Sequence, residues 1–199
     1  KCLRLDPETG EQTREFTLAD KEDSWGRIRI VGDRMFVPVF QKVDGKSDPK
    51  KLVVMDRNTG KLLWSKTSEM SFPLIAIGND KVFCYEGLLE GLYVGAGKNR
   101  VKGAPKAGPI LNIKSFDART GKELWSRTTP RSASWLAYAV EEDVLLVSNK
   151  QGIDAWQGEN GDELWSKEAE GKGFLGHPEN YWDKVIIWKG QILDQRGPG

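Results

Sequence analysis

The sequence predicts an all-β protein built from repeated units of four short strands. Three observations carry this prediction. An eleven-residue pattern returns along the chain, an apolar strand pattern precedes most copies of it, and no segment has the period of an amphipathic helix. Copies of the pattern lie about 40 to 60 residues apart, which indicates an array of similar units rather than one irregular core.

The eleven-residue pattern places an apolar residue and an Asp before a Thr-Gly turn, and a Leu-Trp-Ser strand after it. Asp can hydrogen-bond the backbone of its own turn, Gly accepts a positive φ, and Trp can pack on a neighbouring unit. The copies are residues 5–15 (LDPETGEQTRE), 55–65 (MDRNTGKLLWS), 116–126 (FDARTGKELWS) and 156–166 (WQGENGDELWS). We assign structural, not catalytic, roles to the repeat positions Asp56, Gly60, Trp64, Asp117, Gly121, Trp125, Gly161 and Trp165.

A second strand pattern recurs after short polar turns, at residues 34–40, 81–85, 143–147 and 184–188. Further apolar runs precede these turns, so that one unit contains four strands. Four-stranded units at this period are typical of β-propeller blades. The boundaries are three complete blades at 27–66, 72–127 and 132–167, with partial blades at 1–20 and 173–199.

Two closures of this array are consistent with the sequence. The end strands can pair with each other to make a four-bladed ring, or the chain can be an arc of a larger ring. Residues 1–5 already resemble the interior of a strand, and unpaired end strands would promote aggregation. We therefore expect the arc.

The pattern D-x-x-T-G-x-x-L-W resembles the tryptophan-docking repeat of the pyrroloquinoline quinone (PQQ) repeat propellers. That superfamily includes quinoprotein alcohol dehydrogenases and BamB-type lipoproteins of outer-membrane assembly. The resemblance covers nearly the whole chain and implies an arc of a seven- or eight-bladed ring. It also implies a periplasmic, cell-surface or secreted location.

Charge and cysteine content exclude several classes of function. The chain has 30 basic and 29 acidic residues, so no overall field attracts it to nucleic acid. No apolar run approaches the ~18 residues of a transmembrane helix. Cys2 and Cys84 lie far apart, which excludes a disulfide framework and a local zinc site.

The resemblance also sets out what a PQQ dehydrogenase would need: a Ca²⁺ held by oxygen ligands, an Asp base, and a disulfide between adjacent cysteines. This chain has no adjacent cysteines and no Glu and Asn that match the calcium ligands. We therefore predict no catalytic, cofactor-binding or metal-binding residue in this segment. PQQ with calcium remains an alternative whose site would lie mainly outside the segment.

One insertion breaks the regularity of the repeats. Residues 87–110 occupy a connection that takes only four residues in the third complete blade, and long loops in compact domains tend to be functional or disordered. The insertion contains one acid, Glu90, against several basic residues. We predict a partner-binding loop that uses Lys98, Arg100, Lys102 and Lys106; a flexible surface loop is the alternative.

Residues 41–51 occupy the equivalent hairpin of the preceding blade, so both insertions are expected on one face. The sequence as a whole favours a non-catalytic scaffold that binds a protein. The alternatives are a fragment of a quinoprotein-like dehydrogenase and an accessory domain beside a catalytic one.

Overall fold

The computed structural model describes residues 1–43, 46–68, 72, 74–87, 111–129, 133, 135–149, 152–168, 185–188 and 191–194. Its strands are β1 (Cys2–Leu5), β2 (Gln12–Phe16), β3 (Ser24–Trp25), β4 (Arg29–Val31), β5 (Arg34–Val43), β6 (Lys46–Asp56), β7 (Leu62–Thr67), β8 (Leu74–Gly78), β9 (Lys81–Glu86), β10 (Leu111–Asp117), β11 (Glu123–Thr129), β12 (Trp135–Ala139), β13 (Val144–Asn149), β14 (Gly152–Gln157), β15 (Glu163–Glu168), β16 (Val185–Trp188) and β17 (Gln191–Asp194). The described residues contain no α-helix.

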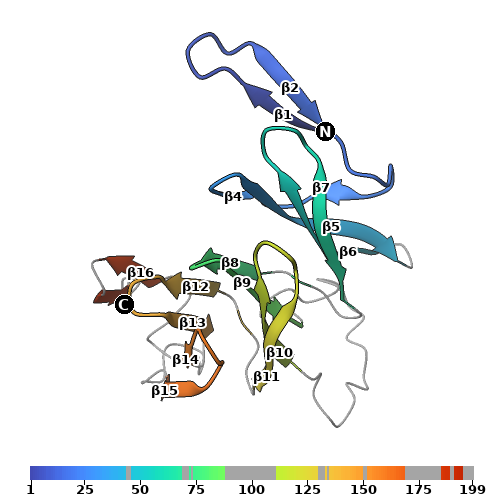
Figure 1. Cartoon of the computed structure of the whole chain (residues 1–199). Coiled ribbons are helices and arrows are strands. Elements are labelled where there is room, and N and C mark those ends of the chain that lie inside the picture. Colours follow the sequence, from blue (N-terminus) through green and yellow to red (C-terminus); the bar gives the residue numbers. More distant parts are fainter. Residues whose placement is uncertain are drawn as a thin grey trace, which may run out of the picture. The chain divides into compact units, whose positions relative to one another are not determined.

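The strands form antiparallel sheets in which sequence neighbours pair (Figure 1). Blade 1 contains β3 and β4, which both pair with β5, followed by β6 and β7. Blade 2 contains β8–β11 and blade 3 contains β12–β15. Two-stranded sheets, β1–β2 and β16–β17, stand at the two ends of the chain. The prediction of three complete and two partial propeller blades is therefore confirmed.

Closure of the chain into a four-bladed ring would require its first and last strands to pair with each other. Among the described residues, β1 pairs with β2 and β16 pairs with β17, in separate sheets. Pairing between the two ends, which a four-bladed ring requires, is not among the described strand pairs.

The first strand of blade 1 is broken. β4 pairs with the start of β5 and β3 pairs with its later part, at Val39 and Phe40. Between them the Gly26 N–H donates to the Pro38 carbonyl at 2.8 Å. A Cβ at Gly26 would overlap that carbonyl, so the close approach of the two backbones requires glycine here.

The chain divides into two compact units. The first unit consists of Lys1–Phe72 and Arg119–Gly121, and the second consists of Pro73–Ala118 and Lys122–Gly199. In the first unit, alternate residues of β5 and β6 face Phe16 of β2. These are Met35, Val37, Val39, Val53 and Met55, all at most 5% exposed. The two-residue period of a strand places them on one face of the sheet.

In the second unit, one face of blade 2 packs on one face of blade 3. Phe83, Tyr85, Ile113 and Trp125 supply the blade 2 side. The blade 3 side consists of Leu136, Leu145, Val147 and Trp156. The Phe83 ring lies 5.9 Å from the Trp125 ring and 4.6 Å from the Tyr138 ring, between centroids.

Each turn glycine of three repeats lies against an aromatic ring from the preceding repeat. A Cβ at Gly60 would lie 3.0 Å from the Phe16 ring, one at Gly121 would lie 2.7 Å from Trp64, and one at Gly161 would lie 2.6 Å from Trp125. The indole N–H of Trp125 also donates to the Gly158 carbonyl at 3.0 Å. These glycines have φ of +71° to +75°.

Trp165 occupies the same repeat position as Trp64 and Trp125. Trp64 and Trp125 are 8% and 7% exposed, whereas Trp165 is 40% exposed. Residues 169–184, which follow blade 3, lie outside the described part of the chain.

Gly161→Ala is expected to destabilise the protein more than Gly10→Ala. Both glycines have φ near +73°, where Ala costs about 1 kcal/mol. Nothing lies within 4 Å of a Cβ at Gly10, whereas one at Gly161 meets Trp125. Overpacking should add about 1–3 kcal/mol at Gly161. Guanidine unfolding followed by Trp fluorescence measures both, and equal losses would contradict the role assigned to the ring contact.

Candidate functional site

The predicted partner-binding loop lies outside the described residues. Lys98, Arg100, Lys102 and Lys106 fall within residues 88–110. β9 ends at Glu86 and β10 begins at Leu111, so the insertion starts and ends at neighbouring strands of blade 2.

The repeat aspartates bind their own turns. Oδ1 of Asp56 accepts hydrogen bonds from the backbone N–H of Asn58 at 2.9 Å and Thr59 at 2.7 Å, and from the Thr59 hydroxyl at 2.8 Å. Asp6 accepts the equivalent three bonds. The hydrogen bond from the Thr59 backbone is the main reason that the pKa of Asp56 lies below its usual value. These two carboxylates therefore hold turns rather than offering a free base.

The fourth repeat keeps the turn but has Gln157 at the Asp position. The backbone bonds are retained, because the Gln157 N–H donates to the Asp162 carbonyl and the Gly161 N–H donates to the Gln157 carbonyl. The Gln157 side chain, however, leaves the turn and reaches Asp143, which directly precedes β13.

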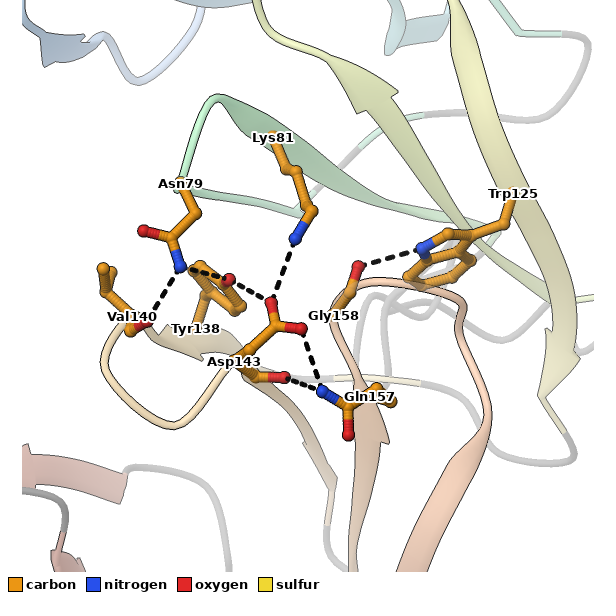
Figure 2. Close-up of polar contacts among 8 residues, drawn as sticks. All are labelled: Asn79, Lys81, Trp125, Tyr138, Val140, Asp143, Gln157 and Gly158. Carbon is orange, nitrogen blue, oxygen red and sulfur yellow. Dashed lines mark hydrogen bonds and ion pairs between the residues drawn. The ribbon is translucent and has the colours of Figure 1, made fainter.

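Asp143 is the centre of a polar group that we name the Asp143 cluster: Asn79, Lys81, Tyr138, Asp143 and Gln157 (Figure 2). Oδ1 of Asp143 accepts the Tyr138 hydroxyl and lies 3.1 Å from Nζ of Lys81. Oδ2 accepts Nε2 of Gln157 at 2.9 Å. Asn79 donates to the Tyr138 hydroxyl at 3.0 Å and to the Val140 carbonyl at 2.8 Å.

The cluster joins two blades. Asn79 comes from the β8–β9 turn and Lys81 from the start of β9, both in blade 2 (Figure 2). Tyr138, Asp143 and Gln157 come from β12, the following turn and β14 of blade 3. Asn79 and Asp143 both have positive φ, +47° and +53°, which Asn and Asp tolerate better than most residues.

Near neutral pH, Asp143 is ionised and Tyr138 is protonated. Burial raises the pKa of Asp143, but hydrogen bonds from Tyr138, Gln157 and Lys81 outweigh burial and bring it below the usual value. Burial, and then the bond to Asp143, raise the pKa of Tyr138. The ionised Asp143 carboxylate and the protonated Tyr138 hydroxyl both already make hydrogen bonds within the cluster. The cluster is therefore suited to holding blades together and not to proton transfer.

A cavity of about 470 Å³ lies within the first unit. This volume falls in the range of small-molecule sites. Its lining combines apolar side chains with two guanidinium groups and a thiol, which suits an apolar group that carries a negative charge. The lining residues are Cys2, Leu3, Arg4, Phe16, Ile28, Ile30, Met35 and Arg57.

Blade 2 also contains a buried ion pair. Nζ of Lys114 lies 2.7 Å from Oε2 of Glu86, whose side chain is 9% exposed. Cys84, opposite Lys114 in the sheet, is fully buried and is a free thiol, as is Cys2. Within the described ranges, no three or more His, Cys, Asp or Glu side chains are placed to hold a metal ion. None of the described residues forms a helix with the length and apolar character that a membrane crossing requires.

Sequence analysis missed the Asp143 cluster, although a signal was present. An Asp precedes the second strand of each complete blade, at Asp33, Asp80 and Asp143. The backbone carbonyl of each accepts a hydrogen bond of 2.7–2.9 Å from a backbone N–H. The donors are Arg57, Ala118 and Gly158, each of which directly follows the Asp or Gln of the repeat. This second recurring Asp, together with Gln157 in place of Asp, could have indicated the cluster.

Stability is expected to depend on the ionisation of Asp143. Because its pKa is lower in the folded protein than its ordinary value of 3.8, the ionised group stabilises the fold above about pH 4. This stabilisation is lost as pH falls through the folded pKa. Asp143→Asn should cost about 1–2 kcal/mol at pH 7 and flatten the decline below pH 4. Urea unfolding at pH 7 and pH 3 tests this; an unchanged pH profile would contradict it.

The two thiols are expected to differ in reactivity. Cys84 is 0% exposed and burial raises its pKa strongly, whereas Cys2 is partly exposed with its pKa raised by lesser burial. Iodoacetamide at pH 8 should alkylate Cys2 in the native protein and Cys84 only after unfolding. Peptide mass spectrometry gives the order, and early labelling of Cys84 would contradict it.

The sheets and their contacts define a β-propeller assembled from four-stranded blades. Residues 112–193 match the family model described as outer membrane protein assembly factor BamB. This match covers less than half of the chain, and over these residues it agrees with the resemblance to PQQ-repeat propellers that the sequence repeats indicate. No curated protein sequence matches the chain significantly.

Solved structures resemble the chain at low sequence identity. The Dos1 propeller has a TM-score of 0.58 at 13% identity, over 88% of this chain and 43% of that one. A chain of the mitotic checkpoint complex has a TM-score of 0.61 at 9% identity, over 94% and 47%. BamB from Moraxella catarrhalis has a TM-score of 0.49 at 17% identity, over 79% and 38%. The chain thus spans less than half the length of each, and the Dos1 likeness supports the propeller fold alone.

Proposed function

We propose that this chain is part of a non-catalytic propeller scaffold that binds a protein partner. The observation that carries the proposal is the match of residues 112–193 to a family model described as an assembly factor. The described polar groups are consistent with it, since Asp6, Asp56 and Asp143 each serve to hold turns or blades.

The proposed contact is the basic insertion between β9 and β10. Lys98, Arg100, Lys102 and Lys106 would attract an acidic surface, and such charges mainly raise the rate of encounter. The family model's description places its members in outer-membrane assembly, so we propose a location outside the cytoplasm.

Charge reversal of the loop tests this proposal. Lys98→Glu, Arg100→Glu and Lys102→Glu together should lower crosslinking of the native parent protein to its partner about tenfold in the source cell. The control reverses three exposed lysines on the outer strands and turns: Lys61→Glu, Lys122→Glu and Lys167→Glu. Equal loss with both sets, or no loss with the loop set, would refute the loop as the contact.

The alternative is a fragment of a PQQ-dependent dehydrogenase, which the same repeat pattern would fit. Because the cofactor site of such an enzyme would lie mainly outside this segment, adding PQQ with Ca²⁺ to the native parent protein and following Trp fluorescence separates the two. A scaffold should show no saturable quenching at micromolar PQQ beyond that of free tryptophan. Saturable quenching that requires Ca²⁺ would favour the dehydrogenase.

A further inference from the structure

The fourth repeat differs from the others at one position that faces another carboxylate. Asp6, Asp56 and Asp117 precede their turns, whereas Gln157 stands at the equivalent position. Its side-chain amide donates both to Oδ2 of Asp143 at 2.9 Å and to the Asp143 carbonyl at 3.3 Å. The replacement therefore puts an amide that binds Asp143 where the carboxylates of Asp6 and Asp56 bind their own turns.

Asp143 is more deeply engaged than Asp33, its equivalent in blade 1. The side chain of Asp33 is 77% exposed and has one ion pair, with Nε of Arg57 at 4.0 Å. The side chain of Asp143 is 24% exposed and binds Tyr138, Lys81 and Gln157. In blade 3, the Asp at this recurring turn position therefore accepts hydrogen bonds from three side chains.

The fourth turn keeps one of the side-chain bonds of the second repeat. In the second repeat the Thr59 hydroxyl accepts the Lys61 N–H at 3.2 Å, and in the fourth repeat Oδ1 of Asn160 accepts the Asp162 N–H at 2.9 Å. Asn160 thus takes the place of Thr59 in this turn, while the Gln157 side chain extends toward Asp143.

The surrounding packing holds the cluster at the boundary of the two blades. A Cβ at Gly78 would lie 2.7 Å from Tyr138 and from Val140, so the β8–β9 turn approaches blade 3 closely. The Tyr138 ring packs on Phe83 from blade 2, while its hydroxyl bonds Asp143 and Asn79. Loss of Asp143 would therefore disturb contacts on both sides of the boundary.

We propose that the Asp143 cluster is an interblade lock, and that Gln157 is the positioning residue that allows it to form. In a repeat array, stability depends on each unit and on its contacts with neighbours. The lock adds a polar interaction to the apolar contact between blades 2 and 3, so that these two blades open together. This conformational device is independent of any partner and goes beyond the proposed function.

A double-mutant cycle in the full chain tests the lock. Gln157→Asp alone removes the amide that donates to Oδ2 of Asp143. The new carboxylate then either lies close to Asp143 and repels it or bonds to its own turn. We expect the unfolding equilibrium constant to rise about tenfold. In an Asp143→Asn background the same change should cost little, because no carboxylate remains to be opposed and Asp at this position can cap the turn. Gln157→Asn, which keeps the amide, controls for side-chain length.

Amide hydrogen exchange in blade 2 provides a second test, because a substitution in blade 3 that acted only within blade 3 would not change it. The Ala118 N–H of blade 2 donates to the Asp80 carbonyl beside the cluster. Asp143→Asn, a change in blade 3, should speed exchange at Ala118, whereas Asp33→Asn should not. Additive costs in the cycle, or equal effects of these two variants on exchange, would overturn the lock. If Gln157→Asp does not fold, the cycle of Lys81→Gln with Asp143→Asn decides the same question.

Discussion

The repeats depend on one contact, in which an aromatic ring lies over the turn glycine of the next repeat. A side chain at Gly121 or Gly161 would overlap the indole, and positive φ already disfavours one. The ring in turn closes the edge of an apolar interface, as Trp125 does beside Phe83. Sheet pairing makes each blade, and within the second unit this contact helps to hold blade 3 beside blade 2.

Polar groups in the described blades are used in two ways. Asp6 and Asp56 saturate backbone donors within their own turns, so their effect is local. The Asp143 cluster uses the same chemistry between blades, where a partly buried carboxylate needs donors from both sides. The difference comes from the fourth repeat, in which Gln157 replaces the capping Asp and bonds to Asp143.

The sequence predicted the features that have a local cause. Gly60 and Gly121 stand where turns require positive φ, and alternating apolar residues such as Met35, Val37 and Val39 mark a strand with a buried face. The recurring Asp and the Gln157 replacement could have marked positions of the Asp143 cluster but not its contacts, because Lys81 and Asp143 are 62 residues apart and meet only when two blades pack. The break between β3 and β4 was missed because it depends on the approach of Gly26 to Pro38. Lys98, Arg100 and Lys102 fall outside the described residues, so their role stays a prediction.

β9 separates two parts of blade 2 that differ in their freedom to change. Lys81, at its start, belongs to the Asp143 cluster, and Glu86, at its end, leads into the insertion. The two ends are about 17 Å apart along the strand. A change in the length of the connection between residues 87 and 110 would therefore leave the hydrogen bonds of the Asp143 cluster in place, because the cluster is formed at the opposite end of β9. A substitution at Lys81, by contrast, acts on both blades at once, because its Nζ is bonded to Asp143 of blade 3.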